Sequence, residues 1–120
     1  MKKRLTINSA KIFNDQLQLN TNEPIASLKP AGHMLVDSDH FSFVYLMENE
    51  VKDYTYIVIP ENVWTDLKGA MEGNLPAFLT FGKEQVELTE FQAEIAYLIS
   101  NIKGNGNYGE EMVEKVEKIF

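Results

Sequence analysis

Residues 41–47, FSFVYLM, and residues 54–59, YTYIVI, are the two stretches that decide the fold of this chain. Each is extended in character, and apolar side chains occupy both alternating sets of positions, as Phe43 and Val44 show in the first stretch. Strands that are apolar on both faces are usually central in a sheet and covered on both sides. We therefore predict an antiparallel pair at the heart of a sheet, joined by the polar loop 48–53.

The sequence before this pair predicts shorter strands that each have one wet face. Apolar and polar residues alternate at 5–8 and again at 16–19, with a turn-forming Asn-Asp pair at 14–15. Residues 20–32 contain two prolines and a glycine, which indicates a loop. A further short strand is expected at 33–36.

After Pro60 the apolar spacing changes from two residues to about 3.6, which is typical of helices. The apolar residues within 63–71 form a helical stripe that ends near Gly73. A second hairpin follows, with strands at 77–81 and 85–88. The glycine that begins its loop is what a type II′ turn requires.

Two amphipathic helices are expected at the end of the chain. Thr89 and Gln92 have the spacing of a capping box at the start of the first helix. Gly104 suits the left-handed residue that ends it. Asn107, with Glu110 three residues later, is expected to cap the second helix.

Together these elements predict an α+β fold. We expect a mostly antiparallel sheet of five to seven strands with about three helices, two of them C-terminal, because hairpins precede the helices instead of alternating with them. The length of 120 residues fits a single domain over residues 1–120. The absence of cysteine excludes a disulfide scaffold, a thiolate metal site and a cysteine nucleophile.

The charge of the chain narrows the classes of partner. A net charge of −7 disfavours nucleic acid, which proteins hold mainly through lysine and arginine on phosphates. No uninterrupted apolar run exceeds five residues, so no membrane association is expected. The alternating residues 5–8 are unlike the apolar core of a signal peptide, and the expected compartment is the cytoplasm.

One cluster has metal-ligand chemistry: His33, Asp37, Asp39 and His40. On an extended strand the first two would share a face, and the last two could curl back through the turn to offer ligands for zinc or manganese. Two histidines and two aspartates within eight residues also arise easily by chance, and Asp-Ser-Asp is ordinary turn material. We therefore predict no metal site, with this cluster as the alternative.

No other pattern indicates catalysis. Residues 104–109 match G-x-G-x-x-G, but a helix precedes them and the chain ends 11 residues later, so they read as a connector between helices and not as a dinucleotide site. Nucleophile-elbow, zincin and P-loop motifs are absent from the sequence. We predict no catalytic residue and no cofactor. A run of glutamates can form either a solvated face or a patch for a basic partner: Glu84, Glu87, Glu90 and Glu94.

The last helix has a strongly apolar face that includes Met112, Val116, Ile119 and Phe120. Such a face is costly to leave in water. It must dock either on its own sheet or on a neighbouring subunit, and the short connector favours its own sheet.

The connector and several other stretches resemble a known family. Residues 101–112, NIKGNGNYGEEM, are the most specific part, and residues 54–60 and 116–120 also fit. The chain is similar over most of its length to a family of small cytosolic proteins of Bacillus-type Gram-positive bacteria that is catalogued only as uncharacterised. The resemblance implies a bacterial cytosolic location and assigns no activity, cofactor or site residue.

The function expected from these features is a non-enzymatic interaction or regulatory module of the bacterial cytoplasm. Its partner would be an unknown protein or a second copy of the chain in a homodimer. The alternative is a small-molecule-binding domain or an enzyme with a cleft between sheet and helices, lined by Tyr45, Tyr54, Tyr56 or Trp64.

Overall fold

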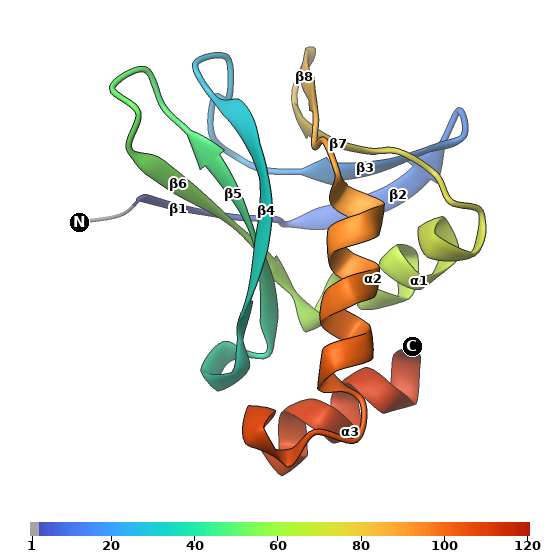
Figure 1. Ribbon diagram of the computed structural model, residues 1–120. Helices are drawn as coiled ribbons and strands as arrows, with labels where there is room; N and C mark the ends of the chain where they lie inside the picture. Colours follow the sequence, from blue (N-terminus) through green and yellow to red (C-terminus); the bar gives the residue numbers. More distant parts are fainter. Residues whose placement is uncertain (1–2) are drawn as a thin grey trace.

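The computed structural model describes residues 3–120 and arranges their eight strands in two four-stranded sheets (Figure 1). The first sheet has the order β1-β6-β5-β4, with β1 at Lys3–Thr6, β6 at Tyr54–Pro60, β5 at Ser42–Glu48 and β4 at Lys29–Asp37. The second sheet has the order β2-β3-β7-β8, with β2 at Ser9–Phe13, β3 at Gln16–Asn20, β7 at Ala77–Phe81 and β8 at Glu84–Glu87.

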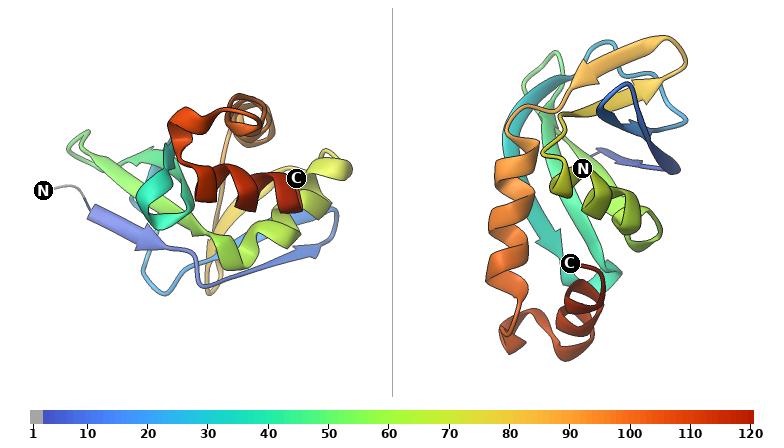
Figure 2. Two further views of the ribbon diagram at one scale, coloured as in Figure 1. Left: turned by 90° about the horizontal axis from the view of Figure 1, so that it is seen from below. Right: turned by 90° about the vertical axis from the view of Figure 1, so that its right-hand side faces the viewer.

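Three α-helices complete the described part of the chain: α1 at Trp64–Glu72, α2 at Phe91–Ile102 and α3 at Glu110–Ile119. Short 3₁₀ segments occur at Ser38–His40, Glu61–Val63 and Gly106–Tyr108. The helix α2 runs alongside β4, and α3 lies below it (Figure 2). Among residues 3–120 no helix combines the length and the apolar character needed to span a bilayer.

The α+β class and the two C-terminal helices are confirmed, but the sheet differs from the prediction. There are eight strands among the described residues, not five to seven, and both sheets are mixed. The pairs β1–β6 and β3–β7 are parallel, and the other pairs are antiparallel. Local alternation identifies a strand, whereas a parallel partner comes from a distant part of the chain, and this is why the mixed sheets were missed.

The predicted central pair is confirmed as β5 and β6, which are antiparallel inside the first sheet. Their register places Tyr45 opposite Ile57 and Phe43 opposite Ile59. These four side chains are fully buried on the inner face, which the helices cover. Met47 lies on the same inner face, and the other apolar residues of the two strands point to the opposite face of the sheet.

The core joins the inner faces of both sheets to the three helices. Trp64 at the start of α1 is fully buried, and its ring centroid lies 4.9 Å from that of Phe43. Its indole N–H donates to the Ile59 carbonyl at 3.3 Å, so the buried polar atom is satisfied. From the second sheet, Leu19 and Leu79 complete this cluster.

Two of the predicted helix caps are wrong. The helix α2 begins after Glu90, which is left-handed with φ 63°, and the Gln92 amide instead donates to the Leu75 carbonyl at 2.8 Å. Asn107 lies inside a 3₁₀ turn, and Gly109 precedes α3. The expected left-handed Gly104 is confirmed with φ 72°. Polar side chains that could cap a helix are equally suited to brace a neighbouring loop.

Candidate functional site

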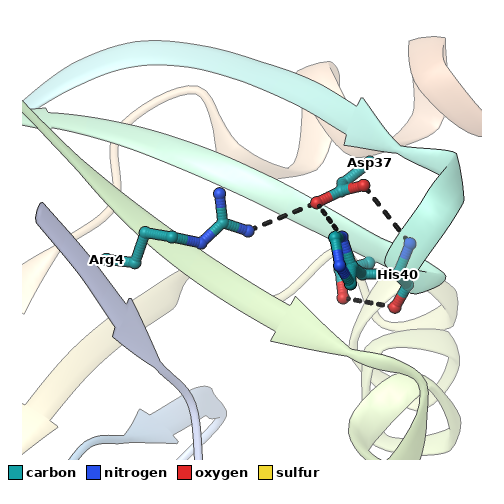
Figure 3. Close-up of polar contacts among 4 residues, drawn as sticks. Arg4, Asp37 and His40 are labelled. Atoms are coloured by element: carbon teal, nitrogen blue, oxygen red, sulfur yellow. Dashed lines mark hydrogen bonds and ion pairs between the residues drawn. The ribbon is translucent and has the colours of Figure 1, made fainter. Parts of the chain in front are cut away.

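The predicted metal cluster lies at the end of β4 and in the 3₁₀ turn that follows it. The Asp37 carboxylate accepts from the Arg4 guanidinium at 3.2 Å, and its same oxygen, Oδ2, lies 3.0 Å from His40 Nδ1 (Figure 3). The His40 backbone N–H donates to the other oxygen at 3.3 Å. This network ties β1 to β4 across the outer face of the first sheet.

The network does not form a metal centre. Of the four candidate ligands only Asp37 and His40 meet, and across residues 3–120 no group of three or more such side chains is placed to hold a metal ion. A guanidinium on the shared carboxylate also competes with a cation. Partial burial raises the pKa of Asp37, but the contacts with His40 and Arg4 outweigh it and hold that pKa below its usual value.

One tyrosine and the tryptophan that were expected to line a cleft lie in the core instead. Tyr45 and Trp64 are both fully buried. The Tyr45 hydroxyl donates to the Thr89 carbonyl at 2.7 Å, and burial raises the pKa of this hydroxyl. Packed side chains occupy the space between the first sheet and the helices at these two positions, so they line no cleft there.

The C-terminal helix packs on its own chain, as expected. Met112 and Val116 are fully buried, and Ile119 and Phe120 are partly buried against the same core. The Phe120 ring lies 6.1 Å from that of Phe43. In the folded chain the apolar side of α3 is therefore covered and offers little surface to a partner.

The four glutamates predicted as a patch divide into two pairs. Glu84 accepts from the Ile25 backbone N–H at 2.9 Å, and Glu94 accepts from the Met34 backbone N–H at 3.0 Å. These two brace a loop and strand β4. Glu87 and Glu90 are exposed. The acidic surface is therefore smaller than the spacing in the sequence indicates.

The outer face of the first sheet is apolar, and it is one of two surfaces that the sequence did not single out. Six side chains alternate with those of the core and point away from it: Leu35, Val44, Leu46, Tyr54, Tyr56 and Val58. We call this set the apolar face. The three helices lie on the opposite side of β4 (Figure 1). Leu35 is 47% exposed and Tyr54 is 40% exposed.

The apolar face contains a hollow of about 280 Å³ beside the Asp37 network. Leu35, Val44 and Tyr56 line it, together with Arg4 and Asp37. The Arg4 guanidinium lies 5.9 Å from the centre of the Tyr56 ring, a distance at which a cation is attracted to an aromatic face. Aromatic, apolar and arginine side chains are the types enriched at protein–protein interfaces.

The second surface is the outer face of the other sheet, where polar side chains surround a hollow and Phe13 and Phe78 also lie. Its hollow of about 740 Å³ is larger than the one on the apolar face. Amide, hydroxyl and ammonium groups from all four strands and the β7–β8 turn line it. The only signal in the sequence was a set of polar residues alternating along separate strands, and the parallel β3–β7 pairing that joins them was not predicted.

Comparison with known proteins gives a family but no function. A family model described as a family of unknown function, UPF0738, matches residues 5–120. A UPF0738 protein of Bacillus licheniformis is 47% identical and the YjbL protein of Bacillus subtilis is 45% identical, each over all of this chain and 99% of the relative. A Staphylococcus aureus relative is 40% identical over 98% of this chain and 96% of its own length. The resemblance noted in the sequence is thereby confirmed. No solved structure matches the chain.

Proposed function

This chain belongs to the UPF0738 family of unknown function, and from that premise we propose that it is a non-enzymatic interaction module of the bacterial cytoplasm. Its docking surface is the apolar face of the first sheet. Its partner is a protein with an apolar contact surface bordered by basic side chains. The single observation that supports this proposal is a row of aliphatic and tyrosine side chains on a sheet face that no described helix covers.

The composition of the face supports a protein partner. Val44, Leu46 and Val58 are buried by their own neighbours yet do not belong to the core cluster. Around them Leu35 and Tyr54 remain substantially exposed. Tyrosine is one of the residue types that most often supply the binding energy of a protein–protein interface.

The charge of the chain favours a basic partner over a second copy. Around the face, the carboxylates of Asp37, Asp39 and Glu48 outnumber the cations of Arg4 and Lys29. The whole chain carries −7, so two copies would repel each other at long range. A basic protein would instead be steered toward this surface.

The test uses the immobilised chain and a lysate of Bacillus licheniformis, which has a relative of nearly the same length. The captured protein is identified, purified and titrated against the chain by calorimetry. We expect a basic protein that binds one to one. The double variant Leu35→Ser/Tyr54→Ser should weaken this binding at least about tenfold, because tenfold corresponds to about 1.4 kcal/mol and interface anchors commonly exceed that.

The matched control is Val51→Ser/Tyr97→Ser, which removes one aliphatic and one tyrosine side chain that are 73% and 64% exposed outside the apolar face. This variant should bind as the unaltered chain does. Affinity should also fall as salt rises. Equal affinities for both double variants, a self-associated dimer in sedimentation, or no protein partner would each overturn the proposal.

A further inference from the structure

The outer face of the second sheet carries a row of four polar side chains that crosses all of its strands. The register places Ser9 beside Asn20, Asn20 beside Thr80, and Thr80 beside Gln85. All four line the hollow of about 740 Å³, which is within the range of small-molecule sites. The next row on the same face contributes Gln18 to the lining.

The internal hydrogen bonds of the hollow leave both donors and acceptors available. The Thr80 hydroxyl lies 3.3 Å from Asn20 Oδ1 and 3.4 Å from the Leu19 carbonyl, so it donates inside the sheet. The Asn20 amide is thereby oriented with its NH₂ group free to donate. Among residues 3–120, Gln18 and Gln85 have no partner for their side-chain amides. Two complete amides and the NH₂ group of a third are therefore available to a ligand in the hollow.

Two lysines border the hollow from opposite ends. Lys11 lies on β2, with its ammonium 5.3 Å from the Phe13 ring centre, and Lys83 lies in the β7–β8 turn without an ion pair among the described residues. One carboxylate, that of Glu84, also belongs to the lining, but its Oε1 already accepts from the Ile25 N–H. The lining thus has a net charge of about +1, whereas the whole chain carries −7.

We propose that this hollow binds a sugar phosphate, with the ammonium group of Lys83 at the phosphate and the amides of Gln18, Asn20 and Gln85 at the sugar hydroxyls. Lys11 adds positive charge at the other end of the hollow. Side-chain amides both donate and accept, which suits hydroxyl groups that do the same. Ammonium groups bind phosphate oxygens as point charges without demanding one orientation. The hollow lies on the second sheet and the apolar face on the first, so the test of this proposal is independent of the test of the proposed function.

The test is a titration of the whole chain, labelled with ¹⁵N, followed by NMR with three probes: ribose 5-phosphate, ribose and inorganic phosphate. We expect ribose 5-phosphate to shift the side-chain NH₂ signals of Gln18, Asn20 and Gln85 with half-saturation at about 1 mM or below. Ribose lacks the charge and inorganic phosphate lacks the hydroxyls. Each should therefore bind at least about tenfold more weakly than ribose 5-phosphate.

Charge-neutral variants locate the phosphate. Lys11→Gln/Lys83→Gln should weaken binding of ribose 5-phosphate at least about tenfold, because the contact of Lys83 with the phosphate and the positive charge of Lys11 are both lost. The control Lys118→Gln removes one positive charge from α3, which is not part of the second sheet. This variant should leave binding unchanged. The variants' backbone spectra show whether each one is folded.

Several results would overturn the proposal. Signal changes centred elsewhere, or none at about 10 mM ribose 5-phosphate, would mean that the hollow is not a site for this ligand. If ribose bound as tightly as ribose 5-phosphate, the lysines would have no role in binding. If inorganic phosphate bound as tightly, the amides would have none. Equal weakening by Lys118→Gln and by the double variant would reduce the effect to net charge.

Discussion

The two sheets of this protein have the same number of strands and one parallel pair each, yet they present opposite chemistry to their surroundings. Both bury an apolar inner face in one core. On the outside the first sheet shows leucine, valine and tyrosine, whereas the second shows mainly amides, hydroxyls and lysines, with Phe13 and Phe78 beside them. A face that only had to meet water would not need aliphatic residues at the centre of the first sheet. This difference supports the two proposals, which assign different binding partners to the two outer faces.

The largest effect should come from uncovering the inner face of the first sheet. Deleting residues 112–120 removes two fully buried side chains, Met112 and Val116, each worth about 1.5–3 kcal/mol, and the Phe120 ring that packs on Phe43. That loss is comparable with the whole stability of a typical domain. We expect a melting temperature lower by more than about 10 °C, or no cooperative transition, with the oligomeric state of the folded chain unchanged.

Melting followed by calorimetry and molar mass from light scattering check this prediction. The variant Phe120→Ala keeps the helix and should lose less stability than the deletion. A dimer that becomes a stable monomer on deletion would show that the helix is an interface and that the inner face is covered differently.

The next effect compares neighbouring residues of β6 that point to opposite faces. Ile57 is fully buried in the core, and Val58 belongs to the apolar face. Ile57→Ala should cost about 2–5 kcal/mol, because the cavity it leaves is enclosed. Val58→Ala should cost less, about 1–2 kcal/mol, because it removes fewer buried methyl groups and Val58, although buried by its neighbours, lies outside the core cluster. Urea unfolding measures both free energies, and equal costs would mean that the outer face is as enclosed as the core.

A smaller effect should come from the Asp37 network at the edge of the apolar face. Asp37→Asn should lower stability at pH 7 by about 0.2–1 kcal/mol, the usual worth of a surface ion pair. The pKa of Asp37 is lowered in the folded chain, so its contribution is full above the ordinary value of 3.8 and is lost as pH falls through the lowered pKa. Unfolding at pH 7 and at acidic pH measures the difference, which should vanish in acid. A difference that persists there would show that it is not ionic.

The sequence predicted the elements of this fold better than their partners. The alternation at 16–19 and the turn before it give β2 and β3 their hairpin, and left-handed Asn14 and Asp15 confirm the turn. The pairing of Leu17 with Ala77 joins positions 60 residues apart, and no local pattern encodes it. The second sheet was therefore missed although most of its strands were predicted.

The candidate surfaces were less predictable than the fold for the same reason. Ser9, Asn20, Thr80 and Gln85 meet only when three strand pairings are known. The apolar residues of β5 and β6 were recognised, but the rule that such strands are covered on both faces assigned Val44 and Val58 to a second buried layer. The helices cover one face only. The face that was expected to be covered by a second layer is the one that we call the apolar face.

The smallest effect on stability is expected from a change on the apolar face. Such a change tests the contrast between the two outer faces most directly, because it alters the surface without altering the fold. Leu35 is 47% exposed, so Leu35→Ser removes little buried area and should change the unfolding free energy by no more than about 0.5 kcal/mol. The same change removes the most exposed aliphatic side chain of the apolar face. We therefore expect weaker retention on a hydrophobic-interaction column than after Val51→Ser, although Val51 is more exposed, because Leu35 is continuous with other apolar side chains and Val51 lies alone in a turn. Retention times and thermal melting of the two variants check this. Equal losses of retention would mean that the outer face of the first sheet does not act as one surface, and the contrast between the two sheets would then lose its functional meaning.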